Sequence, residues 1–193
     1  MTTMRVIAGK YKGRILRTVP DNSVRPATDK VKGAIFNVMQ SRINWSQSQV
    51  LDLFAGSGSV GIEALSRGAK KVVFVESSRS AVQYLKANLE SITTNGNAND
   101  ALNAQVVHGD VYQFIQSLHR QYDVIFADPP YALESLPDLP NTIFERNLVA
   151  DDGYLIIEHP KNFEFHPGSD WEIAVQKNYG RTSVSFFQHK KTE

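Results

Sequence analysis

The sequence predicts an α/β protein built on a mostly parallel sheet, and three observations support this fold class. Short apolar runs recur at Val50–Ala55, Lys71–Val75 and Tyr122–Ala127, as expected of strands buried on both faces of a parallel sheet. Segments with helical spacing of apolar residues separate these runs, so strands and helices alternate along the chain. A glycine-rich turn, Gly56-Ser57-Gly58-Ser59-Val60-Gly61, joins the first run to the helix that follows it.

The N-terminal residues predict a small basic β-hairpin ahead of the main domain. Two short extended runs, Arg5–Ile7 and Arg14–Leu16, flank a turn that contains Lys10, Tyr11 and Lys12. Tyr11 could stack on a nucleic-acid base, or it could be an ordinary surface tyrosine at a hairpin tip. We therefore expect an extension over residues 1–27 and one domain over residues 28–193.

The first helix of the domain is predicted from Thr28, a suitable N-cap, to about Ile43. Its apolar residues recur at helical spacing and should pack on the body of the protein. Lys30, Lys32 and Asn37 are then left to solvent or to a ligand.

The unit from Gln49 to Glu76 organises the chain as strand, turn, helix and strand. Glycines allow a tight turn and close approach of a ligand to the backbone, and free N–H groups at the start of a helix bind electron-rich groups. Glu76 ends the second strand, where an acid can accept both hydroxyls of a ribose. This spacing fits any adenosine-bearing cofactor. Asp52, an acid inside the first strand, favours S-adenosylmethionine, because it could steer the cationic amino group of the methionine end.

The next elements repeat the alternation. A helix is predicted from Ser78 to about Ile92, a polar loop follows, and Ala104–Val107 is a third strand. Asp110, just beyond that strand, could read an adenine amino group or cap the helix from Val111 to Leu118, and both roles are compatible.

The fourth strand runs directly into Asp128-Pro129-Pro130-Tyr131. Two consecutive prolines cannot continue a sheet, so they fix the backbone just after the carboxyl end of a strand, where open α/β sheets bind ligands. A rigid acid, a proline carbonyl that lacks an N–H neighbour and an aromatic ring form a receptor for a planar group bearing an amine.

The remaining chain completes the sheet. Leu133–Pro140 is interpreted as a proline-interrupted loop and a mobile lid, followed by a short helix from Thr142 to Leu148. Gly153–Glu158 is a fifth strand. The segments Trp171–Val175 and Ser183–Phe187 alternate like an antiparallel pair joined by a turn.

Composition narrows the classes of function. The chain of 193 residues has no cysteine, which excludes disulfides, thiolate metal sites and a cysteine nucleophile. No apolar run is long enough for a membrane span and the start is too polar for a signal peptide, so cytoplasmic residence without a membrane partner is expected. Residues 1–45 carry a balance of +7 and the rest −6, although the net charge is +1. Such a split favours a polyanion-binding extension over a merely solvated basic face.

With these residues in view, the chain resembles class I S-adenosylmethionine-dependent methyltransferases. More narrowly it resembles the bacterial RsmD-type family, which methylates the exocyclic N2 amine of a guanine in 16S ribosomal RNA. The blocks that carry the resemblance cover nearly the full length: RVIAGKYKGR, RPATDKVKGAIFN, DLFAGSGSVGIEALSRGA, VFVE, FADPPY and YGRTSVSFF. The DPPY motif indicates methyl transfer to an amino nitrogen but is shared with adenine-N6 enzymes.

The resemblance implies a Rossmann-like sheet of seven strands, mostly parallel with an antiparallel last strand and helices on both faces. It also implies three groups of site residues. Catalytic residues are Asp128, Pro129, Pro130 and Tyr131. Cofactor-binding residues are Asp52, Phe54, Ala55, Gly56, Ser57, Gly58, Glu76, Ser77, Asp110, Val111 and Asp128. RNA-binding residues are Arg5, Lys10, Tyr11, Lys12, Arg14, Arg25 and Lys32. No metal is expected.

The implied partner is 16S ribosomal RNA or an assembling small ribosomal subunit, with a monomeric enzyme. S-adenosylmethionine would be converted to S-adenosylhomocysteine. Three alternatives remain: an adenine-N6 nucleic-acid methyltransferase, a nicotinamide-dependent oxidoreductase and a non-catalytic RNA-binding protein. The oxidoreductase would explain the glycines and Glu76 but leave Asp128–Tyr131 and the basic extension without a purpose.

Overall fold

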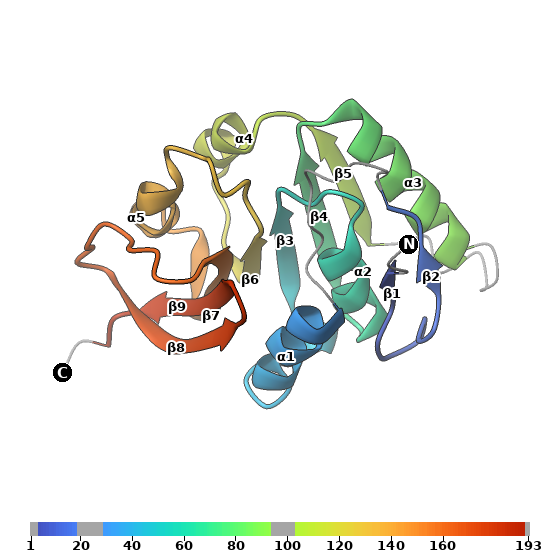
Figure 1. The fold of residues 1–193 in the computed structure, drawn as a ribbon, viewed down its shortest axis with the longest axis horizontal. Helices are drawn as coiled ribbons and strands as arrows, with labels where there is room; N and C mark the ends of the chain where they lie inside the picture. The colour runs from blue at the N-terminus through green and yellow to red at the C-terminus, as the bar shows by residue number, and fades with distance from the viewer. Residues whose placement is uncertain (1–3, 19–28, 94–102, 192–193) are drawn as a thin grey trace.

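The computed structural model describes residues 4–18, 29–93 and 103–191, and its centre is a seven-stranded sheet (Figure 1). The strand order is β5-β4-β3-β6-β7-β9-β8. The strands are β3 Gln49–Leu53, β4 Lys71–Glu76, β5 Ala104–His108, β6 Tyr122–Ala127, β7 Val149–Pro160, β8 Trp171–Tyr179 and β9 Thr182–His189. Strand β9 runs antiparallel to both of its neighbours, β7 and β8; the pairs from β5 to β7 are parallel. The predicted mostly parallel sheet with an antiparallel last strand is therefore confirmed.

Within the described ranges, five helices cover the two faces of the sheet. One face packs against α1 Asp29–Met39, α2 Ser59–Ser66 and α3 Arg79–Thr93, and the other against α4 Val111–Ser117 and α5 Leu139–Glu145. The 3₁₀ turns η1 Trp45–Gln47 and η3 Leu136–Asp138 precede β3 and α5. The fold is the three-layer arrangement that alternating strands and helices predict.

Alternation along each strand fills two separate cores. In β3, Val50 lies in the core under α1–α3, whereas Leu51 and Leu53 lie in the core under α4 and α5. Successive side chains of a strand point to opposite faces, so a strand covered on both sides must be apolar throughout. This is the physical reason that the runs around the glycine turn could be recognised as strands.

The N-terminal extension is a short hairpin held against α2 and α3 (Figure 1). Its strands are β1 Met4–Arg5 and β2 Ile15–Leu16. The buried Glu63 carboxylate accepts the backbone N–H groups of Ile7 (2.7 Å) and Ala8 (3.0 Å). Ser66 continues the junction: its hydroxyl accepts from the Tyr11 N–H at 2.9 Å and donates to the Ala8 carbonyl at 2.5 Å. The predicted hairpin is confirmed. Its strands are shorter than predicted, and hydrogen bonds to α2 fix it on the domain.

One predicted element is wrong. The segment Leu133–Pro140 is not an open lid, because η3 and the first turn of α5 lie within it. Leu136 and Leu139 are fully buried in the core under α4 and α5. The prolines misled the interpretation, since Pro137 and Pro140 each stand at the first or second position of a helical turn, where proline is tolerated.

Other boundaries differ from the predicted ones by up to four residues: β8 ends at Tyr179 rather than Val175, and α5 spans Leu139–Glu145 rather than Thr142–Leu148. Strand β7 begins at Val149, four residues before the predicted strand, and α1 ends at Met39 rather than near Ile43. The predicted cap at Thr28 lies outside the described residues. Within the described ranges, no helix has the length and apolar character needed to cross a membrane.

Candidate active site

Four acids come together at the carboxyl edge of the sheet, on the face covered by α1–α3. Val50, Phe74, Phe126 and Ile156 belong to the core of that face. Each is followed two residues later by an acid, in the order Asp52, Glu76, Asp128 and Glu158. Because side chains alternate with a period of two, the acids on adjacent strands turn toward the same side. The sheet thus gathers negative charge where its strands end.

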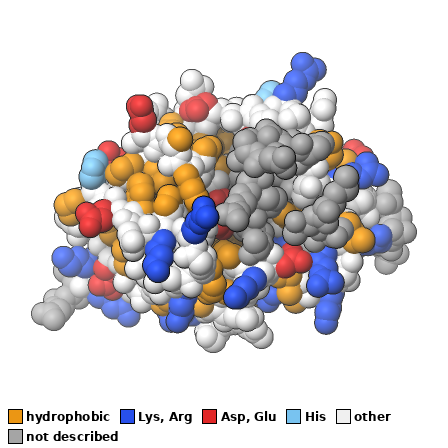
Figure 2. Space-filling model, viewed as in Figure 1, with side chains coloured by type: hydrophobic (Ala, Val, Ile, Leu, Met, Phe, Trp, Pro, Cys, Tyr) orange, Lys and Arg blue, Asp and Glu red, His pale blue; other side chains and the backbone are white. Residues whose placement is uncertain are grey.

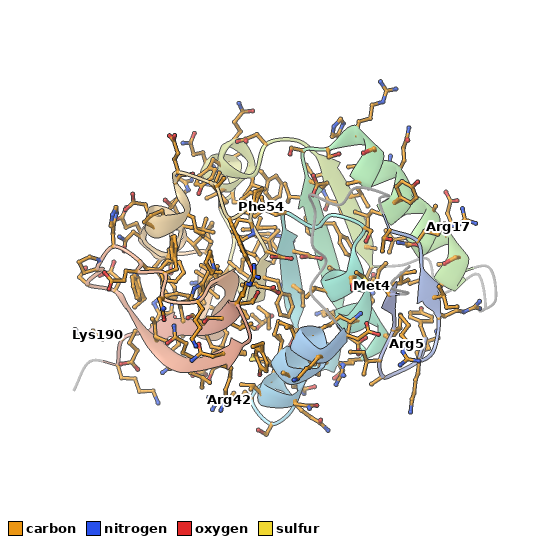
Figure 3. The ribbon with its side chains drawn as sticks, viewed as in Figure 1. Met4, Arg5, Arg17, Arg42, Phe54 and Lys190 are labelled. Carbon is orange, nitrogen blue, oxygen red and sulfur yellow. The ribbon has the colours of Figure 1, made fainter. Side chains whose placement is uncertain are left out.

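The glycine turn between β3 and α2 has the backbone that its residues predict. Phe54, Gly56 and Gly58 have φ values of 55°, 55° and 84°. Figure 3 shows Phe54 at the upper end of β3, where the turn begins. A Cβ on Gly56 would meet nothing within 4 Å, whereas one on Gly58 would lie 2.2 Å from Leu85 Cδ1. Gly58 therefore permits tight packing on α3, and Gly56 leaves its surroundings open for a ligand.

Glu76 is held in place by two backbone N–H groups. Its carboxylate accepts from Gly56 at 2.8 Å and from Ser78 at 2.7 Å. The first bond ties the end of β4 to the glycine turn, and each carboxylate oxygen retains capacity for another donor. The geometry therefore suits the predicted role of accepting ribose hydroxyls, which stays a prediction.

Asp52 is a buried acid beneath the same turn. Its Oδ2 accepts the Gly61 N–H at 2.9 Å. Burial raises the pKa of Asp52 to about 8; the Gly61 bond opposes this and the charge of Glu76 adds to it. A neighbouring cation would reverse the shift by stabilising the carboxylate.

The Asp128–Tyr131 segment follows β6 directly. Burial raises the pKa of Asp128 well above its usual range, and the charges of Glu158 and Asp52 raise it further. Pro129 is buried and Pro130 is exposed. The Tyr131 ring is 45% exposed, yet its hydroxyl lies 2.7 Å from Thr182 Oγ1 of β9. An acid and an aromatic ring thus stand side by side on a rigid backbone, with the ring tethered at its far end.

Two residues of this edge were missed by the sequence reasoning. Glu158, only 8% exposed, was treated as the end of a strand, and Thr182 was given no role. Glu158 could have been found, because it ends the apolar run of β7 as Glu76 ends that of β4. No local signal marks Thr182, since its bond to Tyr131 depends on the antiparallel pairing of β9.

The other predicted cofactor residues line the same edge. Asp110 caps α4 by accepting the Gln113 N–H at 2.9 Å, so the capping role is confirmed and the adenine role stays a prediction. Ser77 is exposed, and its carbonyl lies 3.0 Å from His108 Nε2. The Val111 side chain is buried in the core, which leaves only its backbone for a ligand. Ala55 and Ser57 are partly exposed in the turn.

The predicted RNA-binding residues fall into different environments. Arg5, Lys10 and Lys12 are exposed on the extension, and Arg14 is half-buried. Tyr11 is half-buried against the core, with Lys10 Nζ 5.5 Å from its ring centre. Arg25 lies outside the described residues.

The prediction for Lys32 is wrong. Its side chain is 0% exposed, and its Nζ donates to the Arg5 carbonyl at 2.8 Å and to Ser59 Oγ at 2.9 Å. Burial lowers the pKa of Lys32, and the charges of Glu63 and Asp29 oppose this. The first helix is rotated so that Lys32 faces inward, beside Val31 and Ile35, and cannot reach an RNA phosphate.

Comparison with known proteins agrees with the fold. Residues 4–188 match the model of a family described as Conserved hypothetical protein 95. The Putative rRNA methyltransferase YlbH of Bacillus subtilis is 36% identical over 191 residues, which cover 97% of this chain and 100% of that protein. Ribosomal RNA small subunit methyltransferase D of Haemophilus influenzae is 32% identical over 188 residues, covering 96% and 94%.

Solved structures show the same architecture. The Putative methyltransferase yhhF from Escherichia coli has a TM-score of 0.82 at 28% identity, over 97% of this chain and 98% of that one. The putative methyltransferase SMU.776, complexed with SAH, shares the fold alone, with a TM-score of 0.65 at 17% identity over 86% and 50%.

A sheet of this order, with a glycine turn after one strand and Asp-Pro-Pro-Tyr after its neighbour, defines a class I S-adenosylmethionine-dependent methyltransferase. The full-length match to the family model and the identity to curated relatives narrow the class. The chain belongs to the Conserved hypothetical protein 95 family, the family of ribosomal RNA small subunit methyltransferase D.

Proposed function

We propose that this protein transfers a methyl group from S-adenosylmethionine to the exocyclic N2 amine of a guanine in 16S ribosomal RNA. One observation carries the proposal. The open glycine turn and the rigid Asp128–Tyr131 segment follow adjacent strands and lie at the same edge of the sheet. The resemblance to the RsmD-type family indicates guanine as the methylated base. The names of the relatives support small-subunit ribosomal RNA as the substrate.

The residues of the edge fit S-adenosylmethionine. Gly56 faces open space, and Glu76 has a fixed carboxylate beside it. The charged groups that act on Asp52 and Asp128, within the described ranges, are all acids, so a cationic ligand group would relieve their repulsion. We assign the ribose to Glu76, the methionine end to Asp52 and the glycine turn, and the adenine to the region of Asp110 and Val111. When bound, S-adenosylmethionine supplies a methyl group on a positively charged sulfur.

Positioning of the target amine is the work of the Asp128–Tyr131 segment. The lone pair of an aromatic amine is delocalised into the ring, so the nitrogen is a poor nucleophile. Hydrogen bonds from the amino group to the Asp128 carboxylate and the Pro129 carbonyl would pull the nitrogen toward tetrahedral geometry and aim its lone pair. Tyr131 would stack on the base once it leaves the RNA stack.

We further infer that the extension over residues 1–27 binds RNA through its exposed cations, that the enzyme is a monomer, and that it works in the cytoplasm. These assignments rest on the charge split and on the family. They place the RNA across the extension and the sheet edge together.

Calorimetry with S-adenosylmethionine and with NAD tests the cofactor. Wild-type protein should bind the first and not the second. Glu76→Ala should weaken S-adenosylmethionine binding by about 1–3 kcal/mol, because charged hydrogen bonds to the ribose are lost. Unchanged affinity in that variant would remove Glu76 from the site.

Mass mapping of ribosomal RNA from a deletion strain tests the substrate. One N2-methylguanine of 16S RNA should be missing and should return on incubation with the purified protein. Loss of an N6-methyladenine instead would favour the adenine alternative, which the Asp128–Tyr131 motif also allows.

A further inference from the structure

Two buried polar side chains connect the N-terminal extension to the glycine turn and to the first residue of α2. Lys32 of α1 reaches the Arg5 carbonyl in β1 and the hydroxyl of Ser59, where α2 begins. Asn88 of α3 reaches Arg17, just after β2, and Ser57 inside the turn. Figure 3 labels Arg5 and Arg17 beside α2 and α3.

Asn88 uses its whole amide in this connection. Its Nδ2 donates to the Ser57 carbonyl at 2.9 Å and to the Arg17 carbonyl at 2.9 Å, and its Oδ1 accepts the Arg17 N–H at 2.8 Å. The residue is 1% exposed. A buried amide with three bonds fixes the relative position of the groups it joins, because losing one bond leaves a desolvated polar group.

Lys32 is costly at its position. A buried ammonium group carries a desolvation penalty, and a cation near the N-terminus of α2 opposes the helix dipole. Besides an ion pair with Asp29 of its own helix at 3.7 Å, its hydrogen bonds connect the extension to the start of α2. An apolar residue could keep the packing at this position. We therefore attribute to the Lys32 charge a role in fixing the position of the extension on α2 rather than in stabilising the fold.

The extension and the turn therefore form one hydrogen-bonded body. Glu63 and Ser66 fasten the hairpin loop to α2, and the helix begins where the turn ends. A shift of the extension would strain bonds at both Ser57 and Ser59.

We propose that Asn88 and Lys32 are positioning residues that transmit RNA binding by the extension to the glycine turn, so that RNA and S-adenosylmethionine strengthen each other's binding. The proposal rests on the proposed function. Thermodynamic linkage requires that the two ligands change each other's affinity by the same factor, typically about 5–150-fold in coupled proteins.

The first test measures this factor. S-adenosylmethionine affinity is determined by calorimetry without and with saturating unmodified 16S ribosomal RNA. We expect RNA to tighten it about tenfold in the wild type. In Asn88→Ala and Asn88→Asp the factor should fall toward one, while each ligand still binds alone. Asn88→Asp is isosteric and keeps the acceptor for the Arg17 N–H but loses both donors.

Asn141 offers a matched control on the opposite face of the sheet. Its Nδ2 donates to the carbonyls of His166 and Pro167, and its Oδ1 accepts the Trp171 indole N–H at 2.7 Å. Asn141→Ala removes the same kind and number of bonds but touches neither the extension nor the turn. It should keep the wild-type factor.

The second test needs no RNA. Binding of S-adenosylmethionine alone should slow hydrogen exchange at the amides of Ile7, Ala8 and Arg17 in the wild type and in Asn141→Ala, but not in Asn88→Ala or Lys32→Met. Melting temperatures identify any variant that is simply unfolded, and Lys32→Arg should restore part of the protection.

Distinct results would overturn distinct claims. A wild type that methylates RNA but shows no coupling and no protection of the extension would end this inference and leave the proposed function intact. So would full coupling in folded Asn88 variants. A wild type that binds no S-adenosylmethionine would contradict the proposed function itself.

Discussion

At the scale of single residues, the site is defined by acids that repel one another. Asp128 has Glu158 and Asp52 as its charged neighbours, and Asp52 has Glu76. Sequence reasoning found Asp52, Glu76 and Asp128 because each ends or interrupts an apolar strand beside a motif. It missed Glu158, although this acid ends the apolar run of β7 in the same way; the parallel register of β6 and β7, in which Ala127 pairs with Ile157, brings it to the same edge.

Asp128→Asn tests the proposed role of this carboxylate. An amide has a similar shape but lacks charge, and charge-assisted hydrogen bonds are roughly twice as strong as neutral ones. We expect the methyl-transfer rate to fall about ten- to a thousandfold, with little change in S-adenosylmethionine affinity. Single-turnover kinetics at saturating cofactor would decide it. A variant that transfers methyl at the wild-type rate would sink the mechanism, though not the fold.

Glu158→Gln should change the pH dependence of the same step. The charge of Glu158 raises the pKa of Asp128, so its removal should lower that pKa. If methyl transfer requires the Asp128 carboxylate, the rate rises with pH through this pKa. The acid limb of the pH–rate profile should then move to lower pH in the variant. An unmoved limb would mean that Glu158 is only a structural residue.

At the scale of elements, the β3–α2–β4 unit was the most predictable part of the chain. Its apolar runs, glycines and terminal acid all predict the same strand–turn–helix–strand unit, and the observed bounds of β4 lie within one residue of the predicted ones. The rotation of α1 was less predictable, because its apolar stripe does not reveal that Lys32 lies on the buried side. That orientation is set by partners on β1 and α2, which are distant in sequence.

Gly61→Ala tests how closely α2 must approach the sheet. An added Cβ would lie 2.2 Å from the Phe74 ring and 2.8 Å from the Asp52 carboxylate. Overpacking of this kind costs about 1–3 kcal/mol, so denaturant unfolding should show a loss of that size and S-adenosylmethionine binding should weaken. Gly109→Ala is the control, because its Cβ would meet nothing within 4 Å. Equal stability of the two variants would contradict the tight packing.

At the scale of the whole molecule, positive charge is not confined to the extension. Figure 2 shows Lys and Arg side chains along the lower half of one face, from the side of β8 and β9 to that of the extension. The charge split of the sequence predicted a basic extension. It did not show that further cations of the domain share a face with it, because that depends on how the elements are arranged in space.

Salt dependence tests the role assigned to the extension. Each phosphate contact that is lost should make the log–log slope of RNA affinity against salt shallower by about 0.7–0.9. Neutralising Lys10, Lys12 and Arg14 to Gln should therefore flatten the slope while S-adenosylmethionine affinity is kept. Lys190→Gln, an exposed cation beyond the far end of β9, is the control and should leave the slope unchanged. If the triple variant has the same slope as the wild type, the basic surface is merely solvated and does not bind RNA.

If the cationic end of the ligand binds beside Asp52, as proposed, ligand binding should release a proton from this buried acid beneath the glycine turn. With a pKa of about 8, Asp52 is largely protonated at pH 7 in the ligand-free protein. A cationic group arriving beside it favours the carboxylate, so the proton must pass to the buffer. The heat of S-adenosylmethionine binding at pH 7 should then differ between phosphate and Tris by a fraction of their difference in ionisation enthalpy. The difference should shrink above pH 8 and vanish in Asp52→Asn. The buffer dependence of the binding heat therefore reports the protonation of this one carboxyl group.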